Sequence, residues 1–423
     1  LSLVRVVVII DESQLHTAAG QAAALTAVAT SAKSFGHVVL VLPHDAGLLR
    51  PLPFGDTIAS AAVTLGATIE SHVPQETTHR ILVGDHTAVE GFAVRCWWNG
   101  WCAGVVPKWN SDVLGCSSIP LAGIFAGALA VREVFATVRA DGQAGGRESI
   151  VSLWQPWAED RFKAENPTLV YLPLNLWIVG LGHLGQGYLW SLGFLPATGH
   201  LAVLQDYQRV GYENVATGLL TTVADVTGSK PQKTRIASAW LEHLGWNTAL
   251  IERKFSADVR AQLDDPAIAL SALDDPIPRL LVAKAGFSYM VDAGVGHGAV
   301  DFEMSQIRVL ASGDAPTWNS ERPVISVDKL MKRRAYDEHA RSHDACGTFE
   351  LASAGVAVPF VGAAIGALVI AQAIRLATMR ETVNLLQMEL GCPEIATFGR
   401  VNSPPMTNLG GVPMNFNPVT TAL

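Results

Sequence analysis

LWIVGLGHLGQG, residues 176–187, joins an apolar run to three glycines, Gly180, Gly182 and Gly185, in the spacing G-x-G-x-x-G. The apolar run predicts a buried strand, and the residues after the glycines predict a helix. In such a unit the first glycine permits the tight turn, the second lets the backbone approach a phosphate, and the third lets helix and strand pack closely. The stretch therefore predicts a nucleotide-binding α/β domain, and it leaves NAD(P)-dependent oxidoreductases and other nucleotide-binding enzymes as alternatives.

The alternation of strands and helices continues on both sides of this stretch. Strands are expected at 4–10, 37–42, 80–83, 94–106, 176–179 and 200–204, and helices at 17–35, 56–65, 187–192 and 233–244. Such alternation predicts an α/β fold with parallel sheets covered by helices. No glycine-rich loop follows the first strand of the amino-terminal half, so that half is not expected to bind a nucleotide by itself.

An internal repeat links the two halves. IPLAGIFAGALAVREVF at 119–135 aligns without a gap with VPFVGAAIGALVIAQAI at 358–374. The identical pairs are Pro120 and Pro359, Gly123 and Gly362, Gly127 and Gly366, Ala128 and Ala367, and Leu129 and Leu368. Small residues four apart share one helix face and allow close helix packing. A duplication explains these identities better than a shared Ala/Gly-rich composition, and it predicts a pseudo-dimer.

Composition excludes several classes of protein. The chain has 423 residues, a formal net charge of −8 and no Lys/Arg-rich run, which disfavours a nucleic-acid partner because phosphate neutralisation needs clustered cations. Hydrophobic residues make up 49% and charged residues 16%, so a disordered chain is excluded. We interpret the apolar amino terminus as a first strand, not a signal peptide, and the apolar run 354–374 as a buried helix, not a membrane span.

Several segments after the glycine loop follow the order of one enzyme family. Asp206 ends the second strand, where an acidic residue accepts a ribose hydroxyl. DYQRVGYENVATGLL at 206–220 resembles the D-x-D-x-V-x-x-S-N-L-x-R-Q segment of ThiF/MoeB and ubiquitin-activating enzymes. GSKPQKTRIASAWL at 228–241 resembles their G-x-P-K segment, and SALDDPIPRLLVAKAGFSYMVDAGVG at 271–296 resembles their D-x-x-x-x-R helix start and V-D-A-G-V strand. The resemblance covers residues 176–379, and oxidoreductases do not share it.

This resemblance implies a Rossmann-like adenylation fold and an ATP- and Mg²⁺-dependent adenylyltransferase. The residues implied to bind ATP are Gly180, Gly182, Gly185, Asp206, Asn214, Lys233 and Asp274. Of these, Lys233 would act catalytically by offsetting triphosphate charge, and Asp274 would act catalytically by holding Mg²⁺ through carboxylate oxygens. Lys230 is an alternative to Lys233 because the segment has one extra residue, and Asp275 is an alternative to Asp274.

Two positions depart from the family pattern. The second acid of D-x-D is Gln208, and the arginine of N-x-x-R is Thr217. The missing arginine removes one charge that would neutralise phosphate. Either an arginine of the amino-terminal half replaces it, with Arg5, Arg95 and Arg132 as candidates, or activity is weak or absent, as in a catalytically inactive scaffold of this fold.

The resemblance to ubiquitin-activating enzymes raises the question of a catalytic cysteine. Cys346 ends a polar stretch placed like the family's crossover loop, and His343 or a helix N-terminus could lower the pKa that a thiolate nucleophile needs. A buried structural thiol is the alternative for Cys346, and Cys392 is a weaker rival. Cys96 and Cys102 flank an aromatic strand and are expected in the core. The odd cysteine count, without Cys-x-x-Cys pairs, excludes a zinc ribbon and indicates a reducing, cytoplasmic compartment.

The implied organisation is a degenerate, inactive Rossmann-like adenylation half at 1–145, a linker at 146–172, an ATP-binding ThiF-like domain at 173–400 with a crossover loop at about 313–347, and a tail at 401–423. The implied reaction is adenylation of the carboxyl-terminal glycine of a ubiquitin-like protein, then thioester transfer to a cysteine and hand-over to a conjugating enzyme. Bacterial relatives in ubiquitin-like operons, some linked to antiviral defence, are the nearest resemblance. No membrane partner is expected, and assembly into a homodimer is left open.

Overall fold

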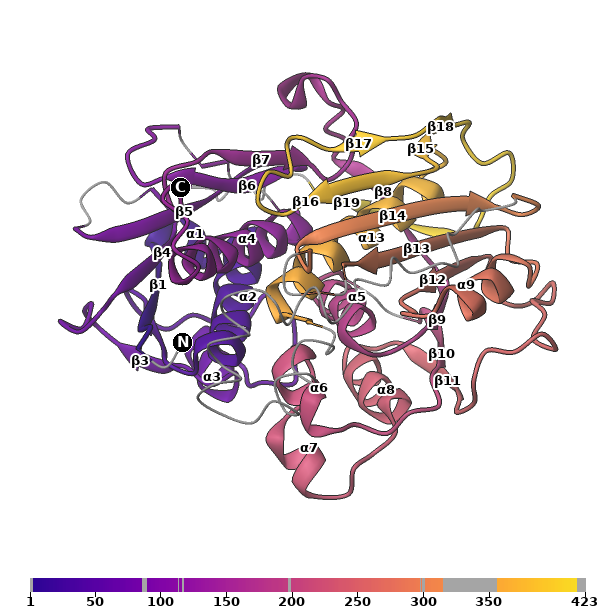
Figure 1. The fold of residues 1–423 in the computed structure, drawn as a ribbon, viewed down its shortest axis with the longest axis horizontal. Helices are drawn as coiled ribbons and strands as arrows, with labels where there is room; N and C mark the ends of the chain where they lie inside the picture. The colour runs from indigo at the N-terminus through magenta and orange to yellow at the C-terminus, as the bar shows by residue number, and fades with distance from the viewer. Residues whose placement is uncertain are drawn as a thin grey trace, which may run out of the picture.

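The computed structural model describes residues 3–85, 90–112, 114–115, 118–196, 199–296, 298, 301–314 and 356–416. Two largely parallel sheets occupy the two sides of the molecule, and a layer of helices lies between them (Figure 1). This arrangement confirms the α/β fold class.

The amino-terminal half forms a seven-stranded sheet in the order β3-β2-β1-β4-β5-β6-β7. Its strands are β1 (Val6–Ile10), β2 (Val38–Val41), β3 (Thr68–Glu70), β4 (His79–Val83), β5 (Phe92–Asn99), β6 (Cys102–Pro107) and β7 (Ser149–Ser152). The pairs from β3 to β5 are parallel, and β6 and β7 add antiparallel strands. The helices of this half are α1 (Glu12–Leu15), α2 (Ala18–Phe35), α3 (Ile58–Thr64) and α4 (Pro120–Val138).

The second half forms an eight-stranded sheet in the order β11-β10-β9-β12-β13-β14-β16-β17. Its strands are β9 (Asn175–Val179), β10 (Leu201–Gln205), β11 (Asn247–Ile251), β12 (Ile268–Ser271), β13 (Tyr289–Val295), β14 (Met304–Ala311), β16 (Leu386–Glu389) and β17 (Thr397–Phe398). The pairs from β11 to β13 are parallel and the later pairs are antiparallel. Its helices are α5 (His183–Gly193), α6 (Tyr212–Thr217), α7 (Val223–Thr227), α8 (Lys233–His243), α9 (Pro276–Ala283) and α13 (Pro359–Ala377).

The two sheets repeat one topology. β1, β2, β4, β5 and β6 occupy the same places, with the same directions, as β9, β10, β12, β13 and β14. The predicted strands and helices of both halves are present. The run expected as strand at 94–106 is a hairpin of β5 and β6, because the chain reverses at Gly100, whose φ of 60° suits glycine.

The ranges expected as linker and tail contain strands. β7 extends the first sheet, and β8 (Leu169–Pro173) pairs antiparallel with β19 (Gly411–Asn415). β15 (Thr382–Val383) pairs with β18 (Val401–Asn402). These pairings satisfy backbone donors and acceptors that an open linker would leave to water. The expected crossover loop, 313–347, lies outside the described residues except for its first two positions.

Glycines bring the helices of the central layer into close contact. A Cβ at Gly187 of α5 would overlap the carbonyl oxygen of Gly362 on α13, and a Cβ at Gly366 would overlap that of Gly187. In the first half, Gly123 and Gly127 of α4 pack in the same way on α2. The repeated glycines therefore have equivalent packing roles in the two halves.

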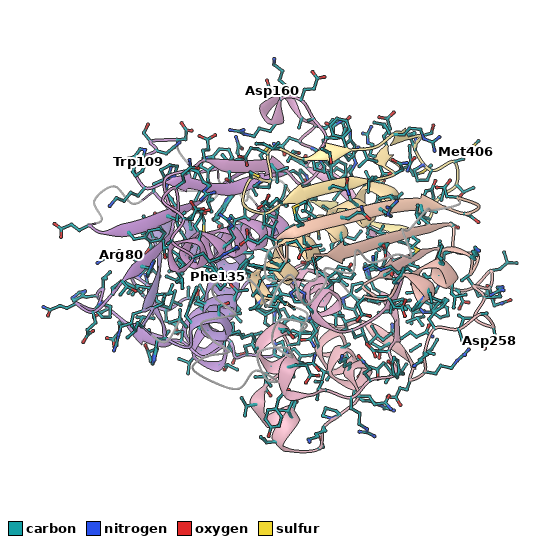
Figure 2. All side chains as sticks on the ribbon, in the orientation of Figure 1. Arg80, Trp109, Phe135, Asp160, Asp258 and Met406 are labelled. Atoms are coloured by element: carbon teal, nitrogen blue, oxygen red, sulfur yellow. The ribbon has the colours of Figure 1, made fainter. Side chains whose placement is uncertain are left out.

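The two repeat helices lie inside the protein. Both α4 and α13 are long and apolar enough to cross a membrane, yet 83% and 100% of their most apolar windows are buried in the fold. Phe135 of α4 lies between the halves (Figure 2), where its ring contacts Phe35, Phe302 and Phe360. The long apolar runs are therefore explained by the contact between the halves.

Candidate nucleotide site

Gly180 and Gly185, after β9, have the turn and packing roles that their spacing predicts, whereas the approach of Gly182 to a phosphate stays a prediction. Gly180 has a φ of 86°, and a Cβ there would lie 2.9 Å from the carbonyl oxygen of Ala272. A Cβ at Gly185 would overlap the carbonyl oxygen of Gly180, so this glycine sets the close packing of helix on strand. At Gly182 the nearest atom to a Cβ is Nζ of Lys233, 3.9 Å away. The middle glycine therefore leaves room beside a cation, as a phosphate cradle requires.

Asp206 ties the end of β10 to the glycine loop. Its Oδ2 accepts a hydrogen bond from the backbone N–H of Leu181 at 2.8 Å, and its Oδ1 accepts one from that of Gln208 at 2.8 Å. Each carboxylate oxygen has a second lone pair, so Asp206 keeps the capacity to accept a ribose hydroxyl. The predicted position of Asp206 at the loop is observed, whereas its contact with ribose stays a prediction.

Lys233 begins α8 and reaches the glycine loop. The residue is 7% exposed, and its Nζ donates to Oε1 of Gln208 at 2.7 Å. Lys230 is exposed, has a φ of 47°, and its carbonyl accepts a hydrogen bond from Arg209. Of the two alternatives, the structure therefore brings Lys233 to the loop.

The two aspartates after β12 have different surroundings. Asp275 caps α9 by accepting from the N–H of Ile277 at 2.9 Å. Asp274 is exposed and follows Leu273, whose Cδ2 would lie 3.2 Å from a Cβ at Gly180. The ends of β9, β10 and β12 share one edge of the parallel sheet. Asp274 therefore stands at the edge that carries the glycine loop, and Asp275 is occupied by capping.

Asn214 has a capping contact in the structure. Its Oδ1 accepts from the N–H of Gly211 at 3.0 Å, which orders the start of α6. The hydroxyl of Thr217 donates to the carbonyl of Glu213 at 2.8 Å. Asn214 thus caps the turn before α6, and its hydrogen bond to ATP stays a prediction.

The buried Gln186 and the half-buried Lys33, which the sequence did not point to, hold α6 and the loop after it. Gln186 of α5 accepts from the N–H of Leu220 at 2.8 Å and donates to the hydroxyl of Thr221 at 2.9 Å. Lys33, from α2 of the other half, donates to the carbonyls of Val215 and Thr221, both at 2.8 Å. Burial lowers the pKa of Lys33 to about 8, against an opposing effect of the Asp225 carboxylate. The amino-terminal half therefore supports the site through a lysine.

The three arginines proposed to replace the missing charge are engaged elsewhere. Arg95 is buried in the first half and pairs with Asp85 at 2.7 Å. Arg132 pairs with Glu303 at 2.9 Å and with its neighbour Glu133 at 2.8 Å. Arg5 is exposed at the amino end of β1, the opposite end from the loop of its sheet. In the described structure none of the three reaches the glycine loop, because the first two are held by carboxylates of their own surroundings.

The surroundings of the three described cysteines raise the pKa of each thiol. Burial raises the pKa of Cys96 to about 12 and raises the pKa of Cys102. Burial, with the carboxylates of Glu389 and Glu394, also raises the pKa of Cys392. Cys346 and His343 lie outside the described residues. None of Cys96, Cys102 and Cys392 therefore has the lowered pKa that a thiolate nucleophile needs.

His183, at the variable position of the glycine loop, has a structural contact. Its Nε2 lies 2.7 Å from the carbonyl oxygen of Val358, which precedes α13. Burial lowers the pKa of His183 to about 4, so the ring is neutral at pH 7 and donates a hydrogen bond. The residue joins the start of α5 to the start of α13.

Comparisons with known proteins show which family the chain resembles. A family model described as the BilD C-terminal domain matches residues 172–380, and one described as the BilD N-terminal domain matches residues 5–153. The bacterial E1-like protein BilD of Collimonas sp. (strain OK412) is 32% identical over 409 residues, 94% of this chain and 87% of that protein. Among solved structures, E. coli MccB matches with a TM-score of 0.33 and 14% identity, over 56% of this chain and 64%, less than two thirds, of MccB.

Proposed function

The chain belongs to the BilD family of bacterial E1-like proteins, and from this premise we propose that it adenylates the carboxyl-terminal glycine carboxylate of a ubiquitin-like protein. In this reaction a carboxylate oxygen attacks the α-phosphorus of ATP, which forms an acyl-adenylate and releases pyrophosphate. The observation that carries the proposal is the position of the buried Lys233 ammonium, which lies beside Gly182 of the glycine loop.

The residues present suit ATP as substrate. The loop leaves room at Gly182, and Asp206 has lone pairs for a ribose hydroxyl. Lys233 would stabilise the negative charge that develops on the phosphates, because a desolvated cation interacts strongly. Mg²⁺, when bound, would neutralise phosphate oxygens further, and the exposed carboxylate of Asp274 is the oxygen donor that we assign to it.

The two departures from the family pattern compensate in charge. Replacing the family's second acid by Gln208 removes one negative charge, and replacing its arginine by Thr217 removes one positive charge. Because Gln208 accepts from Lys233 through a neutral amide, the lysine charge is not cancelled within the protein. The site therefore keeps the net charge of the family pattern without a substitute arginine, which favours a catalyst over an inactive scaffold.

The chain is proposed to be a pseudo-dimer with one nucleotide site. The shared sheet topology and the equivalent glycine contacts support a duplication. In the first half the strand β1 leads to Asp11, Glu12 and Ser13 in place of the glycines, so we expect one ATP per chain.

We propose that a second step follows adenylation, in which the acyl group is transferred to Cys346. The thiolate would attack the acyl-adenylate carbonyl, form the thioester and release AMP, after which a conjugating enzyme would receive the thioester. The raised thiol pKa values of Cys96, Cys102 and Cys392 support Cys346 by disfavouring its rivals.

ATP–pyrophosphate exchange with candidate ubiquitin-like proteins from the same genome tests the proposal. We expect exchange with one candidate, its loss in Asp274→Ala and its retention in Cys346→Ala, with a reductant-sensitive adduct only when Cys346 is present. A folded protein that binds ATP without exchange for any candidate would favour the scaffold alternative. NAD(P)H binding in place of ATP binding would favour the oxidoreductase alternative.

A further inference from the structure

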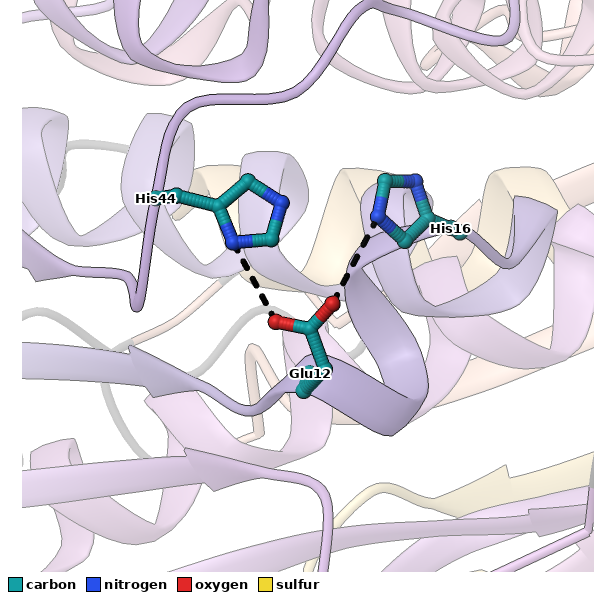
Figure 3. A group of neighbouring side chains, drawn as sticks. All are labelled: Glu12, His16 and His44. Carbon is teal, nitrogen blue, oxygen red and sulfur yellow. Dashed lines mark ion pairs between the residues drawn. The ribbon is translucent and has the colours of Figure 1, made fainter.

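A group of metal-ligating side chains lies in the amino-terminal half, away from the nucleotide site. Oε1 of Glu12 is 3.8 Å from Nε2 of His16, and Oε2 of Glu12 is 3.2 Å from Nδ1 of His44 (Figure 3). One potential ligand atom from each residue lies within 4.8 Å of the others. We propose that Glu12, His16 and His44 form a divalent transition-metal site, with Zn²⁺ as the ion that fits it best.

The position of this cluster is the place where such a fold binds ligands. Glu12 follows β1 and His44 follows β2, so both lie outside the carboxyl ends of adjacent parallel strands. Ligands of open α/β sheets bind at this edge. In the second half the corresponding segments carry the glycine loop after β9 and Asp206 and Tyr207 after β10. The amino-terminal half therefore has ion-binding side chains where the other half has nucleotide-binding ones.

The backbone that carries the three residues is held in place. Asp11 accepts from the N–H of Gln14 at 3.2 Å and from that of Asp85 at 2.7 Å, which fixes the start of α1. Asp45, next to His44, accepts from the N–H of Ala59 at 3.0 Å, which ties the loop after β2 to α3. Glu12 and His16 are four residues apart and share one face of the helical turn. Binding an ion would therefore require side-chain adjustment with little backbone movement.

The donor set selects the kind of ion. Two imidazole nitrogens and one carboxylate are typical of Zn²⁺ and related transition metals, whereas Mg²⁺ and Ca²⁺ prefer oxygen ligands alone. Three protein ligands leave a fourth tetrahedral position for water or an external oxygen ligand. The side chains of Glu12, His16 and His44 are 63%, 57% and 51% exposed, so this position would open to solvent. The site takes a Zn²⁺ ion that can bind an additional small ligand.

Titration of untagged, chelator-treated full-length protein with Zn²⁺ tests the site by calorimetry, and Co²⁺ absorption reports the coordination geometry. In the His16→Ala/His44→Ala variant we expect the affinity for one equivalent of Zn²⁺ to fall by about 10- to 100-fold. The isotherm of the variant should therefore show one tightly bound equivalent fewer than that of the wild type. Exposed histidines of the same half provide the matched control, His37→Ala/His72→Ala, which should keep the wild-type isotherm.

Equal Zn²⁺ stoichiometry in the wild type and the His16→Ala/His44→Ala variant would overturn the proposal, as would an equal loss in the control. Because both histidines lie in the half without a glycine loop, ATP–pyrophosphate exchange should be the same in wild type and variant. Failure of this site is therefore distinguishable from failure of the proposed adenylation.

Discussion

At the scale of single residues, Lys233 combines burial with a neutral partner. Its Nζ is hydrogen bonded to Gln208 and stands nearest to the position of a Cβ at Gly182. We predict that Lys233→Ala lowers the pyrophosphate exchange rate about 100-fold or more, because a preorganised cation that faces developing charge is lost. Lys230→Ala, three residues away and exposed, is the matched control and should retain wild-type exchange. A comparable loss in both variants would mean that the helix start, not the Lys233 charge, is what matters.

Gln208 and Thr217 permit a test of charge compensation. Gln208→Asp would place a carboxylate against the Lys233 ammonium, and the resulting ion pair would weaken ATP binding by about 10- to 100-fold. Thr217→Arg in the same chain restores the family's charge pattern and is expected to recover much of the affinity. ATP titration of the four proteins, including each single variant, measures the coupling. Additive effects of the two substitutions would contradict compensation.

His183 predicts a pH dependence of stability. Its pKa is about 4 in the folded protein against an ordinary value of 6.5, so the unfolded chain takes up the proton first. The stabilising contribution is complete above pH 6.5 and is lost as the pH falls toward 4, on the order of 3 kcal/mol in all. Urea unfolding across this range should show a smaller pH effect in His183→Gln. The exposed control His72→Gln should show the wild-type effect, and identical curves for all three proteins would contradict the prediction.

How far the residues of the site could be predicted depends on whether their role is local. Asp206 follows from its spacing after the glycine loop, and Lys233 follows from the resemblance to the family's G-x-P-K segment, which left Lys230 as an alternative. Lys33 acts across the interface on two backbone carbonyls of α6 and the following loop, and carbonyls carry no sequence signal. Arg95 and Arg132 could not be assigned from sequence, because Asp85 and Glu303 become their partners only when distant strands and helices meet.

At the scale of elements, β-branched runs and helical periodicity located the strands and helices around the glycine loop. The short strands β7, β8 and β19 escaped prediction because their stability comes from pairing with distant segments rather than from local pattern. The sequence repeat predicted that α4 and α13 are equivalent helices, because the glycines that permit close packing recur in both at the same spacing.

The contact between α5 and α13 can be tested through Gly187. Alanine favours a helix over glycine by about 1 kcal/mol, so stability would rise if the position had room. A Cβ at Gly187 would overlap the Gly362 carbonyl, and we predict a net loss of about 1–3 kcal/mol or more for Gly187→Ala in urea unfolding. Gly142→Ala is the control, because a Cβ there meets no atom within 4 Å. Unchanged or increased stability of Gly187→Ala would show that the helices can separate at little cost.

At the scale of the whole molecule, the two halves share one hydrophobic core. This contiguous core includes side chains of α2 and α4 as well as α5 and α13. The buried indole of Trp190 donates to the hydroxyl of Thr26 across the boundary at 2.9 Å. The internal repeat predicted two similar halves, whereas no sequence pattern indicated which helix faces would meet. We therefore expect the halves to unfold together.

Arg132 tests this joint unfolding. It is 6% exposed on α4, and it pairs with Glu303 of the second half and with Glu133, which are 4% and 2% exposed. Arg132→Met removes the partner of the buried Glu303 carboxylate at 2.9 Å and leaves the exposed Arg139 at 3.7 Å, so we expect a loss of up to about 3–5 kcal/mol, the cost of breaking a buried pair. Arg132→Met/Glu303→Gln should recover part of this loss, because the amide is neutral and Glu133 retains Arg147 at 3.4 Å. In calorimetry we expect one transition that moves to lower temperature as a unit in Arg132→Met and partly returns in the double variant. Two transitions, of which only one responds to the substitution, would mean that each half folds on its own core and that the shared helix layer is an interface between independent domains.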